Sequence, residues 1–589
     1  MCGIFGYIGK DDAKKVVLSG LKRLEYRGYD SWGVSVEKDG EVFLEKVVGK
    51  IDEKSPLDSL PYSNIAIGHT RWATHGGVTQ LNAHPHFSSD KSFSLAQNGI
   101  VENYQELKSS LLEKGYSFIS ETDTEVIVRL IEENNKTSNS LFASIMHTFA
   151  ELKGRNTIIV LSNKNEIIAA RNGSPLVIGT NPERSEFYLS SDTLSFSPCA
   201  EFMYVMKNNE IVHIVDGTLN LYSAETGLKI DFTFEKIDII NDKIDKEGYD
   251  HFMLKEIVEQ KHTIREAVQY SEEELKPLVD AIKNADKIYT IGAGTASFAA
   301  AQIAYYLRKI SGKIAIELKS YECGSYKEIF SEKDLILAVS QSGETADTIE
   351  ALEHAKNKGA KIASIVNMYG SSISRMSDYV YYSRSGPEIC VASTKAFTSQ
   401  ISWGLLLAYS FLGRYSDAKN SIENLSDELE TYFTEDTFSN IKNIVDKLIN
   451  KEHFFVLGKG QNFNISLEGA LKIKEITYKH FEGFAAGELK HGVIALIESG
   501  TPVFVIVSDD EDKADMISSA AQIKARGGYV IGVGKNNTLF DDFINTIQDG
   551  ITDPIANVIP FQLISYYLGI KLGYDPDRPR NLAKSVTVK

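Results

Sequence analysis

Residues Asp334 to Val366 read DLILAVSQSGETADTIEALEHAKNKGAKIASIV, and this stretch decides the fold of the second half of the chain. An almost wholly apolar run, Leu335 to Val339, is followed by a turn rich in Ser and Gly and then by a helical pattern. A second apolar run closes the stretch. Continuous apolar strands that alternate with helices are typical of parallel sheets covered by helices on both faces. The stretch therefore predicts an α/β, doubly wound domain.

The same pattern returns later in the chain. Thr501 to Val533 reads TPVFVIVSDDEDKADMISSAAQIKARGGYVIGV and aligns with the first stretch. The strand, glycine turn and helix at Lys287 to Glu317 align in the same way with His453 to Gly483. Two units that match in the same order indicate a duplication. The second half is thus predicted to hold two doubly wound domains in tandem.

The first half has a different pattern, short β-rich runs with helices between them, which predicts an α+β domain. The runs are Ile4 to Ile8, Gly33 to Val36, Ile65 to His69, Phe93 to Asn98, Thr157 to Leu161 and Phe187 to Ser190. A stretch rich in Asp, Lys and Glu from about Phe232 to Tyr249 reads as a linker. The predicted divisions are a first domain at 2–225, a linker at 226–255, doubly wound domains at 256–440 and 441–575, and a tail at 576–589.

Composition excludes several classes of protein. The 589 residues are 43% hydrophobic and 24% charged, which is ordinary for globular domains. With 63 Lys and Arg against 80 Asp and Glu, the net charge of −17 is a poor match for nucleic acid or an anionic membrane. No apolar stretch reaches the roughly 18 residues of a membrane span. Cys2, Cys199, Cys323 and Cys390 form no CxxC pair, so we expect a reducing cytoplasm rather than disulfides or zinc.

The chain begins Met1-Cys2-Gly3-Ile4-Phe5-Gly6. If Met1 is removed, Cys2 carries a free α-amine with an ordinary pKa of about 7.7 to 8.0, low enough to serve as a base for its own thiol. The alternative is an incidental small residue beside the initiator Met. Other sequence motifs in the same domain are needed to choose between a nucleophilic and an incidental Cys2.

Three such blocks follow: HTRWATHG at His69 to Gly76, Asn98-Gly99, and TDTE at Thr122 to Glu125. An Arg and an Asp suit the α-carboxylate and α-ammonium of an amino acid, and an Asn amide beside a Gly N–H suits an oxyanion.

Each block also has a plainer interpretation. Arg71 fits a surface ion pair, Asn98-Gly99 a hairpin turn, and Asp123 a helix N-cap. A metal site is a further alternative, although its spacing matches no standard zinc pattern. Its candidate ligands are Cys2, His75, His84 and His86.

Together and in this order, the blocks resemble the glutaminase domain of the class II, N-terminal-nucleophile glutamine amidotransferases, which have an αββα sandwich fold. The resemblance covers most of residues 2 to 225. It implies that Cys2 attacks the glutamine amide and that Asn98 and Gly99 form the oxyanion hole. It further implies that Trp72 is a gate for ammonia and that the glutamine is held by Arg71, Thr74, His75 and Asp123.

In the first repeat, the strand ending at Val339 runs into Ser340 to Thr345, SQSGET, and then into a helix. Hydroxyls and backbone N–H groups at a helix N-terminus form an anion site, and phosphate is the obvious ligand. An ordinary helix cap is the alternative. The second repeat has Ser508 to Asp512, SDDED, in the same place, and its carboxylates would repel a phosphate. Only the first copy is predicted to bind one.

SQSGET and VASTKAFT, at Val391 to Thr398, resemble the sugar isomerase (SIS) domains. The resemblance implies a phosphosugar ligand. The first glycine loop departs from the family's CGTS, because Ala293 and Ala296 stand at the Cys and Ser positions. Either one hydroxyl is missing from the phosphate site, or Ser297 replaces it. The implied sugar-binding residues are Thr295, Ser340, Gln341, Ser342, Thr345, Val391 and Ser393.

The second repeat carries EGALKIKE, in which Glu468, Lys472 and Glu475 share one face of a helix. By pattern alone this is a solvated salt-bridge stripe. Two further segments stand out in this half of the chain. They are GELKHG at Gly487 to Gly492 and PRNLAKSVTV near the end of the chain, where a terminal segment would ordinarily fray.

These three segments resemble those of the isomerising glutamine:fructose-6-phosphate aminotransferase family. The resemblance implies that Glu475 moves a proton between C1 and C2 of the sugar and that His491 opens its ring. Lys584 would engage the carbonyl, Lys472 would add positive charge, and Ala583 would line the sugar. Fructose 6-phosphate and glutamine would yield glucosamine 6-phosphate and glutamate, the first step of hexosamine synthesis.

Two other functions remain open: an amidotransferase or deglycase acting on another phosphosugar, and a SIS sensor that binds phosphosugar without turnover. The sequence has no Walker motif, no reliable GxGxxG loop and no metal pattern, so no cofactor or metal is expected. The resemblance implies a homodimer that acts on small molecules, and the cysteine usage and net charge predict a cytoplasmic protein that binds neither nucleic acid nor membrane.

Overall fold

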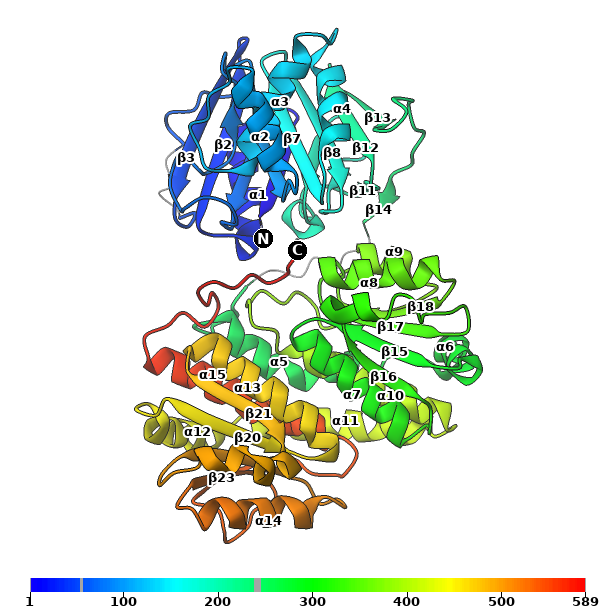
Figure 1. Cartoon of the computed structure of the whole chain (residues 1–589), viewed down its shortest axis with the longest axis vertical. Helices are drawn as coiled ribbons and strands as arrows, with labels where there is room; N and C mark the ends of the chain where they lie inside the picture. The colour runs from blue at the N-terminus through cyan, green and yellow to red at the C-terminus, as the bar shows by residue number, and fades with distance from the viewer. Residues whose placement is uncertain (1, 53–56, 238–244, 588–589) are drawn as a thin grey trace. The chain divides into compact units, whose positions relative to one another are not determined.

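The computed structural model describes residues 2–52, 57–237 and 245–587, and the chain divides into two compact units (Figure 1). The first comprises Met1–Lys243 together with Ser585–Lys589, and the second spans Ile244–Lys584. Part of the predicted linker, residues 238–244, lies outside the described residues. The finer domain boundaries stay predictions.

The first unit is built on two antiparallel sheets. The eight-stranded sheet has the order β14 (Glu235–Lys236), β11 (Phe202–Val205), β9 (Val177–Thr180), β10 (Phe187–Ser190), β1 (Gly3–Ile8), β4 (Ile65–Arg71), β2 (Ser31–Lys38), β3 (Glu41–Val48). The six-stranded sheet has the order β13 (Thr218–Ser223), β12 (Glu210–Val215), β8 (Glu166–Asn172), β7 (Asn156–Ser162), β6 (Phe93–Gly99), β5 (His86–Phe87). Every β-run predicted from the sequence is a strand.

Successive side chains of β1 point to opposite faces of its sheet, which shows why the two sheets stack. Ile4 lies in the core between the two sheets, whereas Phe5 and Tyr7 point the other way, into the core beneath α1 (Ala13–Leu24). Gly6 lets the sheets approach, because a Cβ there would lie 2.6 Å from the Ile159 side chain. The second sheet is covered by α3 (Asp123–Asn135) and α4 (Leu141–Glu151), with α2 (Tyr104–Glu113) beside them. The predicted αββα sandwich is confirmed.

The second unit contains two five-stranded, wholly parallel sheets of the same strand order. The first is β16 (Ala315–Lys319), β15 (Ile288–Gly292), β17 (Leu335–Ser340), β18 (Lys361–Val366), β19 (Tyr379–Tyr382). The second is β21 (His480–Ala485), β20 (His453–Gly458), β22 (Pro502–Val507), β23 (Tyr529–Gly534), β24 (Asp542–Asn545). Along β15, Ile288 and Tyr289 enter different cores, so both faces are covered. The two predicted doubly wound domains are confirmed.

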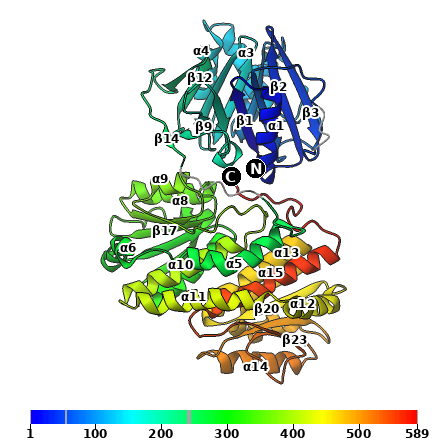
Figure 2. The same cartoon turned by 180° about the vertical axis from the view of Figure 1, so that it is seen from behind.

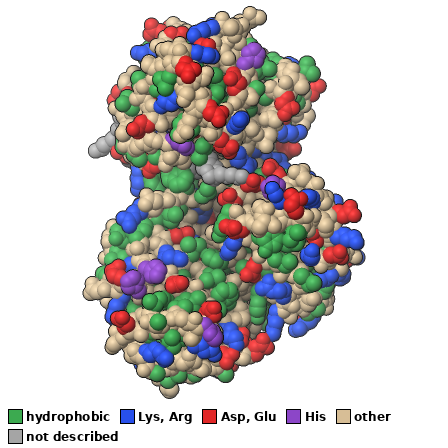
Figure 3. Space-filling model, viewed as in Figure 1, with side chains coloured by type: hydrophobic (Ala, Val, Ile, Leu, Met, Phe, Trp, Pro, Cys, Tyr) green, Lys and Arg blue, Asp and Glu red, His purple; other side chains and the backbone are tan. Residues whose placement is uncertain are grey.

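Helices surround these sheets, and the corresponding helices of the two repeats, α7 and α13, lie against each other (Figures 1 and 2). They are α5 (Phe252–Glu266), α6 (Glu272–Asn284), α7 (Thr295–Lys309), α8 (Ala346–Asn357), α9 (Ser372–Met376), α10 (Lys395–Phe411), α11 (Tyr415–Tyr432), α12 (Glu435–Leu448), α13 (Phe463–Thr477), α14 (Lys513–Lys524) and α15 (Asp553–Lys571). Among the described residues, no helix is long and apolar enough to span a bilayer. Basic and acidic side chains are interspersed over the face in Figure 3.

The tail as far as Lys584 is tied to the second unit rather than frayed. The Asp577 carboxylate accepts the backbone N–H groups of Phe252 and Met253 at 3.0 and 2.8 Å, which caps α5. The Arg580 N–H donates to the Tyr478 hydroxyl at 2.7 Å, and its guanidinium lies 4.1 Å from that ring's centroid. These contacts fix the direction in which the chain continues to Lys584.

Packing between α13 and α15 can be tested at Gly469, where a Cβ would lie 2.6 Å from Phe561 Cγ. Gly→Ala inside a helix ordinarily stabilises by about 1 kcal/mol, but overpacking costs about 1–3 kcal/mol. We therefore expect Gly469→Ala to lower the Tm in calorimetry. Gly324→Ala is the control, because a Cβ there meets nothing within 4 Å. Equal or higher stability of Gly469→Ala would contradict this packing.

Candidate functional site

Cys2 is brought to its neighbours by strand pairing. β1 and β4 are antiparallel with Gly3 opposite Thr70, so Cys2 comes to lie beside the end of β4. The Trp72 N–H donates to Cys2 Sγ at 3.4 Å. Burial raises the pKa of the thiol, the Arg71 charge lowers it, and the Asp123 charge raises it. Three residues predicted from separate blocks therefore act on one site.

Arg71 is buried, so the alternative of a surface ion pair is wrong. Its guanidinium donates to the carbonyls of Gly76 and Gly77 at 3.2 and 3.1 Å, and also to that of His75. It thereby fixes the loop that follows β4. Thr74 is exposed on this loop, and His75 is half-buried.

Asn98 and Gly99 end β6 and remain paired with β7, so they do not form a hairpin turn. The Asn98 side chain is buried, and its Oδ1 has no hydrogen-bond partner among the described residues. Gly99 has a φ of +133°, and a Cβ there would lie 1.9 Å from the Arg155 carbonyl oxygen. A buried amide oxygen without a partner is uncommon, and the Nδ2 group of the same amide is the one that could donate to an oxyanion.

Asp123 is the first residue of α3, not its cap. The N-cap is Thr122, whose side-chain oxygen accepts the Glu125 N–H at 3.3 Å. The Asp123 Oδ2 instead accepts the Val101 N–H at 2.9 Å, just after the Asn98-Gly99 pair. Burial raises the pKa of Asp123. The carboxylate thus joins α3 to the candidate oxyanion hole.

The histidines of the metal alternative are not arranged as ligands. His84 packs with His69 and His86 at ring-centroid distances of 4.3 and 5.0 Å, whereas His75 packs edge-on against Tyr104. Burial lowers the pKa of His84 and His86 well below the usual value, so they are neutral. Within the described residues, no group of three His, Cys, Asp or Glu side chains could hold a metal ion.

In the second unit, the loop after β17 is shaped by its own hydroxyls and a glycine. Ser340 Oγ accepts the Gly343 N–H at 3.0 Å, and Ser342 Oγ accepts the Glu344 N–H at 3.2 Å. Gly343 has a φ of +65°, a left-handed conformation that favours glycine. The Gln341 carbonyl accepts the Asn367 N–H at 3.1 Å, which anchors the loop to the neighbouring strand.

Thr345 occupies the N-cap position of α8, but its side chain makes no capping hydrogen bond. The Thr345 hydroxyl is thus not a cap, whereas the Ser340 and Ser342 hydroxyls accept N–H groups of the turn. The strands β15 and β17 are parallel neighbours, so the helices that follow them, α7 and α8, begin at the same edge of the sheet. From β15 the chain continues to β16 on one side, and from β17 it continues to β18 on the other. This switch point is where doubly wound sheets bind ligands.

Ser297 does not replace the missing hydroxyl of the glycine loop. Its Oγ donates to the Gly294 carbonyl at 2.7 Å and accepts from Lys319 Nζ at 2.8 Å. Burial lowers the pKa of Lys319. The structure thus adds a lysine at the first turn of α7 that no motif indicated.

The matching loop of the second repeat holds carboxylates that are already bonded. Asp510 Oδ2 accepts from Gln461 Nε2 at 2.8 Å, and Asp512 pairs with Lys459 at 3.0 Å. These contacts support the prediction that only the first copy binds an anion.

On α13, Glu468, Lys472 and Glu475 share a face as predicted, but the face is buried. The Lys472 side chain is 1% exposed, so the solvated salt-bridge interpretation is wrong. Its Nζ lies 2.6 Å from Glu475 Oε2 and 3.5 Å from Glu468 Oε1. It also donates at 2.8 Å to Thr295 Oγ1, at the start of α7.

The two carboxyl groups around Lys472 differ. Burial raises the pKa of Glu468 to about 8, so this group is mostly protonated at pH 7. Burial would lower the pKa of Lys472, but the charges of Glu468 and Glu475 outweigh it and raise that pKa. Glu475 has a side chain 19% exposed, against 0% for Glu468. Of the two, Glu475 is the carboxylate accessible to a ligand.

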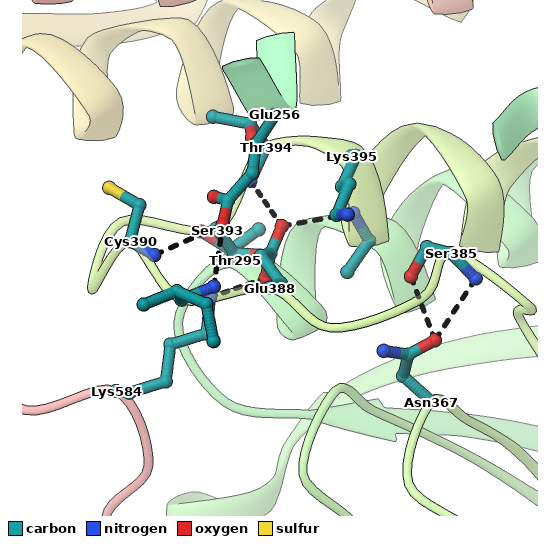
Figure 4. A network of polar contacts seen from close by, with 12 residues as sticks. Glu256, Thr295, Asn367, Ser385, Glu388, Cys390, Ser393, Thr394, Lys395 and Lys584 are labelled. Carbon is teal, nitrogen blue, oxygen red and sulfur yellow. Dashed lines mark hydrogen bonds and ion pairs between the residues drawn. The ribbon is translucent and has the colours of Figure 1, made fainter. Parts of the chain in front are cut away.

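Lys584 reaches a second buried carboxylate, Glu388, and pairs with it (Figure 4). Ser393 Oγ donates to Glu388 Oε2 at 2.9 Å, and the Val391 N–H donates to the Asp577 carbonyl at 3.1 Å. Ala583, half-buried, directly precedes this lysine. The Glu388 charge also contributes to the raised pKa of Lys472.

His491 is not part of this arrangement. It ends the 3₁₀ helix η5 (Ala486–His491), it is exposed, and within the described residues it has no hydrogen bond or ion pair with either cluster. Its role in ring opening stays a prediction.

The comparisons with known proteins agree with this geometry. A glutamine amidotransferase domain model matches residues 69–197, and a SIS domain model matches 281–410 and 447–571. The chain is therefore a glutamine amidotransferase domain joined to paired SIS domains. Glutamine–fructose-6-phosphate aminotransferases (isomerizing) of Pyrococcus horikoshii and Aquifex aeolicus are 39% and 38% identical to it over the full length of both chains. The chain belongs to this family.

A solved structure covers the second unit. The C-terminal domain of glucosamine-fructose-6-phosphate aminotransferase from Francisella tularensis matches with a TM-score of 0.53 and 30% identity. The match spans 57% of this chain and 100% of that one.

The burial of Lys472 predicts a large stability effect. Lys472→Met would leave Glu475 without its buried cation, and breaking a buried pair costs about 3–5 kcal/mol. We expect a clear drop in the midpoint of urea unfolding. Lys474→Met, on the exposed side of the same helix, should change stability by at most about 0.5 kcal/mol. Equal shifts of both variants would contradict the buried placement.

Proposed function

We propose that this protein transfers the amide nitrogen of glutamine to fructose 6-phosphate and isomerises the product to glucosamine 6-phosphate, releasing glutamate. The observation that carries the proposal is the buried Lys472, which contacts both Glu475 and Thr295. It joins a carboxylate able to move protons to the start of a helix beside the phosphate-type loop. The full-length similarity to isomerizing aminotransferases supports the same assignment.

In the first unit, the Cys2 thiolate would attack the side-chain amide of glutamine. After removal of Met1, the α-amine of Cys2 would accept the thiol proton and return it to the leaving ammonia. Asn98 and the Gly99 N–H would stabilise the oxyanion. The α-carboxylate and α-ammonium of glutamine would be held by Arg71, Thr74, His75 and Asp123.

In the second unit, the sugar phosphate would bind at the N-terminus of α8. The groups proposed to hold it are Ser340, Gln341, Ser342 and Thr345, with Thr295, Val391, Ser393 and Ala583 lining the sugar. Lys584 would engage the open-chain carbonyl. Glu475 would then carry a proton between C1 and C2 while Lys472 stabilises the negative charge of the enolate-like intermediate.

Ammonia must travel in a shielded form, because water at pH 7 would protonate it. Trp72 is proposed as the gate of this path, since its backbone directly contacts the Cys2 thiol. The protein is also proposed to be a cytoplasmic homodimer. Light scattering of the purified protein gives its mass in solution and so tests whether it is a dimer.

The two competing functions predict different products. Incubation with glutamine and fructose 6-phosphate should give glucosamine 6-phosphate, identified by mass. Nitrogen transfer to other ketose or aldose phosphates, with none to fructose 6-phosphate, would favour a different acceptor. Binding of phosphosugar without any product would favour the sensor, although a sensor needs neither Cys2 nor Glu475.

Loss of the thiol should abolish the first half-reaction. We expect Cys2→Ala to reduce glutamine hydrolysis by at least about 10⁴-fold, because the nucleophile is gone. Glutamate release, measured with a coupled dehydrogenase assay, checks this. Cys199→Ala, at an exposed free cysteine, is the control and should retain full activity. Wild-type hydrolysis by Cys2→Ala would exclude Cys2 as the nucleophile.

The two half-reactions should also separate at Glu475. Glu475→Gln keeps the shape of the side chain but removes its basicity, so amino-sugar formation should fall about 10²–10⁴-fold. Glutamine hydrolysis should persist. Glu482→Gln, at an exposed position on β21, should leave both activities unchanged. An equal loss of both activities in Glu475→Gln would contradict the division of labour.

A further inference from the structure

Glu388 is a buried carboxylate that no motif indicated, and it receives four donors (Figure 4). Its Oε1 accepts the N–H groups of Thr394 and Ala396 at 2.8 and 3.1 Å, at the beginning of α10. Its Oε2 accepts from Ser393 Oγ and from Lys584 Nζ. One side chain thus contacts the Ser393 loop, the N-terminus of α10 and Lys584 of the C-terminal tail.

The ion pair with Lys584 lies out of water. The Glu388 and Lys584 side chains are 0% and 3% exposed. Burial would raise the pKa of Glu388, but Lys584 and the N–H groups of α10 outweigh it and lower that pKa. Glu388 is therefore ionised. Buried ion pairs contribute little net stability because desolvation offsets their attraction, so this one calls for a functional reason.

A second carboxyl group nearby is neutral and cannot substitute for Glu388. Glu256 Oε1 accepts the Cys390 N–H at 3.2 Å and the Ile389 N–H, whereas its Oε2 has no partner among the described residues. Burial, and then the charge of Glu388, raises the pKa of Glu256 to about 8. The nearby Lys395 is paired with Glu259 at 2.7 Å. The base in contact with the Lys584 ammonium is thus Glu388.

An ammonium group cannot attack a carbonyl, because its lone pair is occupied by a proton. We propose that Glu388 is a positioning residue that directs Lys584 at the sugar and takes up the proton that this lysine must lose before its amine attacks. This inference rests on the proposed function, in which Lys584 engages the sugar carbonyl. It adds Glu388 as the base that deprotonates Lys584 in a site from which water is excluded.

The step balances without an external reagent. A proton moves from the Lys584 ammonium to the Glu388 carboxylate, and the free amine bonds to C2 of the open-chain ketose. The carbonyl oxygen takes a proton from the nitrogen and then the proton from Glu388, and it leaves as water. The products are a protonated imine and an ionised Glu388, so the carboxylate faces a cation at the start and at the end.

The test is reductive trapping of the full-length protein. Fructose 6-phosphate and borohydride should fix the imine as a stable adduct on Lys584, detected by peptide mass. In Glu388→Gln the amide oxygen can still accept from the α10 N–H groups but cannot take a proton. We expect trapping and amino-sugar kcat to fall about 10²-fold or more. The KM for fructose 6-phosphate should change much less, and glutamine hydrolysis, which depends on the first unit, should be retained.

Two further variants separate chemistry from structure. Glu256→Gln alters a carboxyl that is already neutral, so it should trap the sugar at the wild-type rate. Glu388→Asp keeps a carboxylate and should recover part of the kcat that Glu388→Gln loses. Wild-type trapping by Glu388→Gln, or no better activity in Glu388→Asp than in Glu388→Gln, would overturn the inference.

Failure of the proposed function gives a different result. In that case the unaltered protein would form no amino sugar at all. If it does form amino sugar but gives no adduct on Lys584, the function stands and the relay through Glu388 is wrong.

Discussion

The hydrogen bond from Lys472 Nζ to Thr295 Oγ1 is the interaction on which the proposed sugar site depends. It joins α13 of one repeat to α7 of the other, and it exists because the two sheets share one strand order and place equivalent helices side by side. The loop proposed to bind phosphate and the carboxylate proposed to carry the proton come from different copies of a duplicated unit. Neither copy alone would hold both.

The site on the first unit depends on strand register instead. The antiparallel pairing of β1 with β4 sets Cys2 beside Trp72, and the buried Arg71 shapes the loop that follows. A shift of one residue would turn Ile4 away from the core between the sheets. Burial of the core therefore fixes the position of Cys2, the proposed nucleophile.

Much of this could be predicted from the sequence. The strands, the duplication and the shared face of α13 follow from local periodicity, which reports the direction of side chains. Periodicity does not indicate which other elements pack on a helix face. The sequence pattern therefore predicts a solvated Lys472, although this residue is buried. Glu388 gives no local signal, because its partner Lys584 is distant in the chain and arrives only through contacts such as that of Asp577 with α5. Ser297 illustrates the same limit, since its hydroxyl is already used by Gly294 and Lys319.

The loop at Ser508 to Asp512 bears on stoichiometry. The two repeats carry equivalent loops after β17 and β22, but the second loop holds carboxylates, of which Asp510 accepts from Gln461 and Asp512 pairs with Lys459. The proposed function therefore implies one bound sugar per polypeptide rather than two.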